Sequence, residues 1–113
     1  FKAMRYLYAR GLALSTALIT DGRFSGTNNG CFVGHISPEA AEGGPIAIVH
    51  DGDRIVIDVE SRSLELKVPQ EEIEARLKAW KRPEPKFKKG WLGLYCKIAA
   101  SGSEGAILKY DNL

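Results

Sequence analysis

Hydrophobic and polar residues follow two different spacings along the chain, and each spacing predicts a different kind of element. Residues 1–10 and 70–80 place apolar side chains on one helical face, and residues 91–100 are predicted to form a last helix. Short apolar or alternating runs predict strands at 14–20, 31–33, 46–49, 55–59, 64–68 and 106–109. The sequence therefore predicts a mixed α/β domain, in which residues 46–68 form a half-buried antiparallel meander.

Signals at the ends of elements add a short helix and a turn. Ser37 is a candidate N-cap for a helix over residues 38–42, with Pro38 at its first position and the glycine pair at 43–44 ending it. A helix this short does not persist alone in water, so we expect tertiary contacts to hold it. The Asp-Gly pair at 51–52 predicts a turn.

The stretch with the most distinctive chemistry is residues 20–30, which follow an apolar run. Gly22 and Gly26 bracket the start of this loop and allow backbone conformations that other residues avoid. Residues 27–30 (Thr-Asn-Asn-Gly) add strong turn signals. Loops at strand ends often carry the chemistry of a protein, and Ser25 is the small nucleophilic or basic group that this loop would present.

Composition narrows the classes of protein. The chain has 113 residues and a net charge of +2, which gives no reason to expect a nucleic-acid partner. No apolar run approaches the roughly 18 residues of a membrane span, and no signal peptide is visible, so no membrane partner is expected. Cys31 and Cys96 lie far apart and cannot by themselves fill a four-thiolate site. Reduced thiols in the cytoplasm are the expected state.

Two long motifs carry a resemblance to a known family. The first is Thr-Asp-Gly-Arg-Phe-Ser-Gly at residues 20–26, and the second is Gly-His-Ile-Ser-Pro-Glu-Ala-Ala-Glu-Gly-Gly-Pro-Ile-Ala at residues 34–47. With the Asp-Gly-Asp run at 51–53, they resemble the C-terminal domain of the dihydroxy-acid and sugar-acid dehydratases over about residues 1–108. The resemblance implies a swivelling β/β/α domain, with a small β-barrel-like sheet flanked by helices.

The resemblance also implies a place for this chain in a larger enzyme. Residues 1–113 are expected to be one domain, the C-terminal and base-supplying one, with the N-terminal cluster-binding domain absent. A chain that opens at Phe1 within a predicted helix agrees with this expectation. The implied partners are a small dihydroxy acid or aldonic acid, the enzyme's own N-terminal domain and a second copy in a homodimer.

The family's reaction is the loss of water from a 2,3-dihydroxy carboxylate or a sugar acid, which yields a 2-keto acid. The resemblance implies that Ser25, once deprotonated, removes the proton from C2. A cluster iron or a magnesium ion would polarise the C3 hydroxyl as a Lewis acid. The ligands of the iron–sulfur cluster and of Mg²⁺ are expected mostly or wholly outside this chain, so no metal ligand is assigned here. The isolated chain is expected to be inactive.

Other residues of the two motifs are candidates for binding and support. Arg23 is a candidate either to contact the acidic substrate or to brace the loop, since a guanidinium suits a carboxylate. Backbone amides around Gly26, Thr27 and Asn28 could hold the substrate carboxylate as a nest does. The candidates for supporting roles are Asp21, His35, Glu39 and Glu42.

Two other interpretations are open from the residues alone. A serine hydrolase would use Ser25 with His35 as base and Asp21 as orienter. A nucleophile elbow, however, needs glycines two residues before and two after the serine, where Arg23 and Thr27 stand. A noncatalytic module would bind RNA or a neighbouring domain through the basic connector, which is otherwise a solvated stretch (Lys81, Arg82, Lys86, Lys88 and Lys89).

The sequence departs from the commonest family pattern beside the loop. Residues 27–30 replace a more usual Gly-Thr-Arg-Gly run, and Phe32 stands where a smaller aliphatic residue is frequent. These positions bear on substrate choice, so a branched-chain precursor, a hexonate and a pentonate all stay open.

Overall fold

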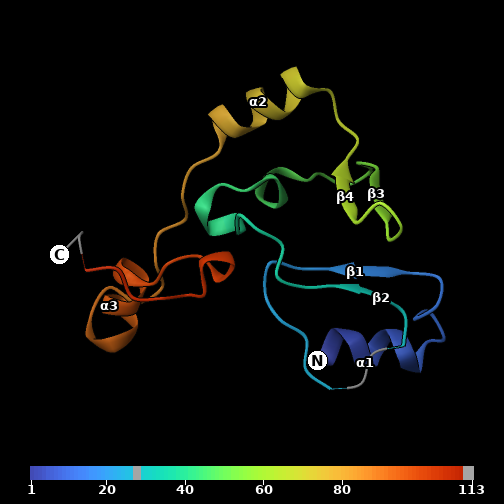
Figure 1. Ribbon diagram of the computed structural model, residues 1–113, viewed down its shortest axis with the longest axis horizontal. Helices are drawn as coiled ribbons and strands as arrows, with labels where there is room; N and C mark the ends of the chain where they lie inside the picture. The colour runs from blue at the N-terminus through green and yellow to red at the C-terminus, as the bar shows by residue number, and fades with distance from the viewer. Residues whose placement is uncertain (27–28, 111–113) are drawn as a thin grey trace.

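The loop that carries Ser25 connects the two strands of a small parallel sheet near the N-terminus. The computed structural model describes residues 1–26 and 29–110, and Figure 1 shows their arrangement. Strand β1 (Ala17–Ile19) pairs in parallel with β2 (Cys31–Val33), and helix α1 (Lys2–Ala9) lies beside this sheet. Two parallel strands need a crossover connection between them, and the loop that follows β1 provides it.

A hairpin and a helix form a second group of elements, above the first in Figure 1. Strands β3 (Ile55–Asp58) and β4 (Ser63–Leu66) are antiparallel, with Ile55 opposite Leu66. Helix α2 (Gln70–Ala79) follows and packs against the short 3₁₀ helix η2 (Pro45–Ile48). The predicted helices at 1–10 and 70–80 and the predicted hairpin strands are confirmed.

The strand predicted at 46–49 is wrong, because residues 45–48 form the 3₁₀ helix η2. A short apolar run looks the same whether it is a strand or a buried helical turn, so its pattern could not decide between them. Pro45 occupies the first helical position after Gly44, where a fixed φ favours a helical turn. The predicted meander over 46–68 is therefore reduced to the β3–β4 hairpin.

The short helix predicted at 38–42 begins two residues later, as η1 (Ala40–Glu42). Ser37 is not its cap. The first helical N–H, that of Ala40, donates instead to the carboxylate of Asp21, 19 residues earlier in the chain. A cap from so distant a residue leaves no local sequence signal.

The chain from residue 90 onward consists of a helix and a loosely paired segment. Helix α3 (Gly90–Ile98) confirms the last predicted helix, and the 3₁₀ helix η3 (Gly102–Glu104) follows it. The strand predicted at 106–109 is not formed as such, and this segment makes one isolated antiparallel bridge between Ala99 and Leu108. The run predicted at 14–20 is a strand only over its last part, as β1.

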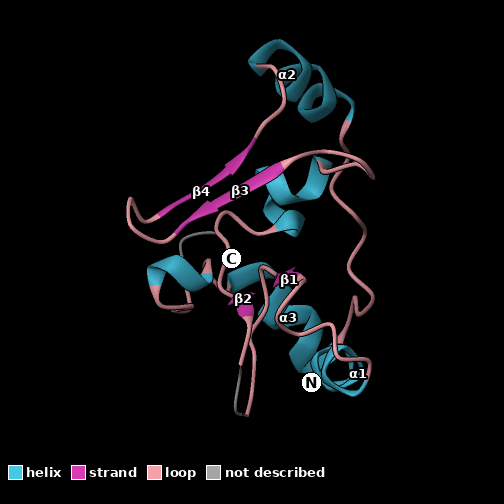
Figure 2. Cartoon of the chain, turned by 90° about the vertical axis from the view of Figure 1, so that its right-hand side faces the viewer, coloured by secondary structure: helices cyan, strands magenta, loops and turns pink. Residues whose placement is uncertain are grey.

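No closed barrel is present in the part of the chain that the structure describes, where the strands form two separate two-stranded sheets. Figure 2 shows the β3–β4 hairpin standing apart from β1 and β2. Among the residues that the structure describes, the buried hydrophobic side chains are those of Met4, Ala13, Ile48 and Ile98. The described helices include none that is long and apolar enough to cross a membrane.

The described structure is open for its size. Its radius of gyration is 16.4 Å, whereas a compact domain of about 100 residues has a radius near 13 Å. Its accessible surface is 9015 Å², against about 6,100 Å² for a compact monomer of this mass. Much apolar surface that a closed domain would bury is therefore exposed.

Candidate functional site

The loops after β1 and β2 are joined by backbone hydrogen bonds beyond the two strands. The amide of Thr20 donates to the carbonyl of Val33 at 2.9 Å, and the amide of Ile36 donates back to the carbonyl of Thr20 at 3.2 Å. The amide of His35 donates to the carbonyl of Gly22 at 2.9 Å. Because the carboxyl ends of parallel strands lie at the same edge, the two family motifs meet at this edge.

Ser25 lies between Phe24, which is packed, and Gly26, which has a left-handed backbone conformation. The ring of Phe24 is half-buried and meets the ring of Phe32 edge-on, with 5.6 Å between the ring centroids. On the other side Gly26 has φ +91°, in the left-handed region that favours glycine, and a Cβ there would come within 3.4 Å of the ring of Phe1, the residue before α1. The serine itself is exposed. The loop thus presents the Ser25 residue to solvent, next to the packed ring of Phe24.

The acidic residues of the two motifs tie the loop to other parts of the chain. Asp21 accepts a hydrogen bond from the amide of Ala40 at 2.8 Å. The neighbouring carboxylate, that of Glu39, accepts from the Ser101 hydroxyl at 2.8 Å and from the Gly102 amide at 2.8 Å. These bonds, the one from Gly102 first, lower the pKa of Glu39. The loop, η1 and the C-terminal segment are therefore linked through adjacent residues.

Glu42 faces the connector between α2 and α3. Its carboxylate pairs with the guanidinium of Arg82 at 2.5 Å, and both side chains are at least half exposed. Beside it Gly43 has φ +77° and lies under the ring of Trp80, where an added Cβ would be 3.2 Å from the ring. Glu42 therefore helps to attach the connector to η1. The basic connector is also partly neutralised, since Lys88 pairs with Glu84.

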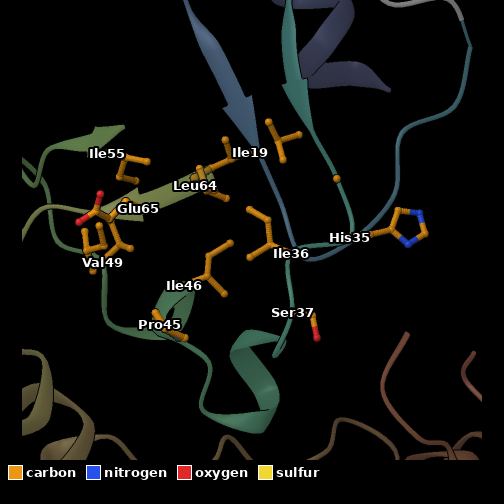
Figure 3. A pocket seen from close by; sticks show the side chains of 13 residues that line it. Ile19, His35, Ile36, Ser37, Pro45, Ile46, Val49, Ile55, Leu64 and Glu65 are labelled. Atoms are coloured by element: carbon orange, nitrogen blue, oxygen red, sulfur yellow. The ribbon is translucent and has the colours of Figure 1, made fainter. Parts of the chain in front are cut away.

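The side chains of Arg23 and His35 are exposed, and neither forms a hydrogen bond or ion pair with another described residue. His35 has φ +56°, in the left-handed region that non-glycine residues seldom adopt. Its imidazole points away from the neighbouring pocket (Figure 3). The predicted binding residue Thr27, and Asn28 with it, lie outside the described residues.

The hydrolase arrangement is not formed. Among the residues that the structure describes, no hydrogen bond joins Ser25, His35 and Asp21. The Asp21 carboxylate is directed at the amide of Ala40 instead. A Ser–His–Asp triad needs the base to bond both the serine and its orienting carboxylate, so the geometry gives this interpretation no support.

An aliphatic pocket of about 360 Å³ opens beside the segment that follows β2. Figure 3 shows side chains from β1, the β2 end, η2 and β4 pointing toward one space. Its apolar lining is Ile19, Val33, Ile36, Pro45, Ile46, Val49, Ile55, Leu64 and Leu66. The pocket lies between the two sheets and has few polar groups, so it resembles part of an unfilled core more than a site for a hydroxylated acid.

The described residues do not fit a metal or an iron–sulfur cluster. They include no group of three or more His, Cys, Asp or Glu side chains placed to hold a metal ion. Both cysteines are free and exposed, Cys31 on β2 and Cys96 on α3. Iron–sulfur clusters need several thiolates together, and these two belong to separate elements.

One ion pair was not predicted from the sequence. Asp53, in the Asp-Gly-Asp turn, forms two hydrogen bonds with the guanidinium of Arg76 on α2, at 2.5 and 3.1 Å. Arg76 also donates to the carbonyl of Ile48 at 3.0 Å, so it holds the turn, η2 and α2 together. Its bonds, followed by that from the His50 amide, lower the pKa of Asp53 to about 2. The turn motif was visible in the sequence, but its partner 23 residues later was not.

A comparison with protein families gives a match over most of the chain. The family model described as dihydroxy-acid/6-phosphogluconate dehydratase C-terminal matches residues 1–106. The match includes the Ser25 loop, the motif at 34–47 and the Asp-Gly-Asp turn, and it extends through α3 and η3.

Proposed function

The chain belongs to the dihydroxy-acid/6-phosphogluconate dehydratase family as a C-terminal domain, and on this premise we propose that it supplies the base of a hydro-lyase. The substrate is a 2,3-dihydroxy carboxylate or a sugar acid. The observation that carries the proposal is the family match across both motifs, together with the exposed position of Ser25 where the loops after two parallel strands meet. Catalytic residues lie disproportionately on loops that a regular scaffold positions.

In the proposed reaction the Ser25 alkoxide takes the proton from C2 of the substrate. The electron pair of that C–H bond forms the C2–C3 double bond, and the C3 hydroxyl leaves as water after gaining a proton. The resulting enol moves a proton from its C2 oxygen to C3, which gives the 2-keto acid. Atoms and charge balance without an oxidant or a reductant.

A serine hydroxyl is a very weak acid, so this role sets a demand on the surroundings of Ser25. A base works best when its pKa is near the working pH, and an alkoxide needs positive charge or hydrogen-bond donors around it. Arg23 is a cation on the same loop and two residues away. We propose that Arg23 holds the substrate carboxylate, together with backbone amides at Gly26 and Thr27, and that the alkoxide is stabilised by groups outside this chain.

The ligands of the iron–sulfur cluster and of Mg²⁺ are proposed to lie in the N-terminal domain. The donor set described above does not suit either group. The reaction steps assigned to this chain are therefore only those of its own residues: positioning the substrate and removing the C2 proton.

The openness of the chain supports docking onto that N-terminal domain. An accessible surface of 9015 Å² and the aliphatic pocket between the two sheets leave apolar side chains exposed to water. Exposed apolar patches of this kind mark interaction surfaces. Docking would cover them and exclude water from the Ser25 loop, which strengthens electrostatic interactions in the site.

The test uses the full-length enzyme that contains this chain, purified without oxygen. Formation of 2-keto acid is measured with dihydroxyisovalerate and a panel of aldonic acids, for the wild type, Ser25→Ala and a control, Ser15→Ala. Ser15 is exposed, and its hydroxyl donates to a nearby carbonyl, that of Leu12. We expect Ser25→Ala to lose activity and Ser15→Ala to keep it. Turnover by the 113-residue chain alone would contradict the proposal that the reaction also needs the N-terminal domain.

A further inference from the structure

A continuous relay of contacts runs from the active loop to the C-terminal segment. Asp21, four residues before Ser25, accepts from the amide of Ala40 at 2.8 Å. Glu39, which directly precedes Ala40, accepts hydrogen bonds from the hydroxyl of Ser101 and the amide of Gly102. The relay thus joins residues that are 62 and 63 positions apart in the sequence.

The middle of the relay is a tightly built turn. The amide of Gly44 donates to the carbonyl of Glu39 at 3.1 Å. Gly44 also lies so close to Pro38 that an added Cβ would be 1.9 Å from its carbonyl oxygen. The turn therefore leaves the backbone of Glu39 little room to move. Because Ala40 follows Glu39 directly, the position of Glu39 sets the position of the Ala40 amide that donates to Asp21.

The far end of the relay is also held in place. The amide of Ala100 donates to the carbonyl of Ile107 at 2.9 Å, and the amide of Lys109 donates to the carbonyl of Ile98 at 2.7 Å. Ile98 is one of the buried core residues. The Ser101 hydroxyl that donates to Glu39 therefore stands on a braced loop.

We propose that Glu39 is a positioning residue, through which the segment Ser101–Gly102 sets the place of the Ser25 loop. The inference rests on the proposed role of Ser25 as base. The Glu39 carboxylate does not touch the substrate. It fixes η1, and η1 fixes Asp21 at the start of the loop. The Glu39 carboxylate is ionised at neutral pH, so the bonds from Gly102 and Ser101 are charge-assisted, and they lower its pKa.

The competing interpretation is a purely structural cap. In that case Glu39 stabilises η3 and the fold, and its loss reduces the amount of folded enzyme without changing the chemistry of the enzyme that remains. The two interpretations differ in the rate of the chemical step. A displacement of about 1 Å in a catalytic group can cost on the order of 100-fold in rate, whereas a smaller folded fraction leaves ratios of rates unchanged.

The variants are Glu39→Gln, Ser101→Ala and the double variant, all in the full-length enzyme. Glu39→Gln keeps the size of the side chain but removes its charge and one acceptor. The matched control is Lys109→Ala, which removes an exposed ion pair with Glu104 in the same segment and leaves the Glu39 contacts in place. Each variant is assayed for kcat, for KM and for the kinetic isotope effect with substrate deuterated at C2.

We expect kcat to fall about 10- to 100-fold in both single variants, with KM within about threefold and a larger isotope effect than in the wild type. The isotope effect rises because removal of the C2 proton becomes more rate-limiting, and as a ratio it does not depend on how much enzyme is folded. The double variant should lose little more than either single one, as residues of one network do. Lys109→Ala should match the wild type.

An unchanged isotope effect and unchanged kcat per folded enzyme in Glu39→Gln would overturn the proposal and leave Glu39 as a cap. Additive losses in the double variant would overturn it as well. Ser25→Ala, run in parallel, separates this from the proposed function. If Ser25→Ala is inactive while Glu39→Gln behaves as wild type, only the positioning role fails. If Ser25→Ala stays active, the assignment of the base fails.

Discussion

Gly44 is the glycine at which substitution by alanine should destabilise the fold most. Its φ of −65° is open to any residue, so backbone strain is not the issue. The obstacle is space, because a Cβ would lie 1.9 Å from the carbonyl oxygen of Pro38 and 2.6 Å from its carbonyl carbon. Both are backbone atoms, which cannot turn aside as a flexible side chain can. Gly44→Ala must therefore push the turn that carries Glu39 away.

The expected cost is at the upper end of the range for overpacking, about 3 kcal/mol of the free energy of unfolding. At about 4 °C per kcal/mol for a domain near this size, the melting temperature should fall by about 12 °C. Gly52→Ala is the matched control, since Gly52 has φ +93° but nothing within 4 Å of an added Cβ. It should cost about 1 kcal/mol through left-handed strain alone.

The assay is thermal unfolding of the purified chain, followed by circular dichroism for the wild type and both variants. The reasoning predicts that Gly44→Ala melts well below Gly52→Ala, and that Gly52→Ala melts below the wild type. Equal melting temperatures for the two variants would show that the close approach of Gly44 to Pro38 does not constrain the fold, and would refute the argument.

Three further predictions concern the packing around the site. Asp53→Asn should make stability depend less on pH in acid. Folding lowers the pKa of Asp53 from 3.8 to about 2, so the wild type loses the stabilisation from the ionised carboxylate as the pH drops from about 4 to 2. The variant has no such carboxylate to lose, and acid unfolding followed by fluorescence measures the difference. Ile48→Ala removes a side chain that is 4% exposed and should cost about 2–5 kcal/mol in urea unfolding; a cost below about 1 kcal/mol would show that Ile48 is not core. Glu42→Gln breaks a pair whose side chains are 50% and 61% exposed and should change stability by less than about 1 kcal/mol in the same assay, so a larger loss would mean that this pair carries the connector.

The sequence predicted the elements that depend on local pattern and missed the ones that depend on distant partners. The helices α1 and α2 have periodic apolar faces, and the hairpin strands alternate, so both were visible. The run that became η2 was too short for its pattern to distinguish a strand from a helical turn. The barrel implied by the resemblance is not closed in the described residues, which leave the two sheets apart.

The same division holds at the site. The two motifs located the Ser25 loop and its neighbour in advance, because each is a long and unusual run of residues. The contacts that hold the loop could not be predicted. Asp21 bonds an amide 19 residues away, and Glu39 bonds groups more than 60 residues away. The local sequence around Asp21 or Glu39 does not indicate the bonding partner, because tertiary packing brings each pair together.

The most direct test of the central claim is the rate of C2 proton removal with and without the Ser25 hydroxyl. Full-length wild type and Ser25→Ala, matched for bound metal content, are mixed with substrate deuterated at C2, and the 2-keto acid is measured over a single turnover. A general base contributes about 10²- to 10⁴-fold, so the account predicts a loss of that size in Ser25→Ala. A variant that keeps more than about a tenth of the wild-type rate would contradict it.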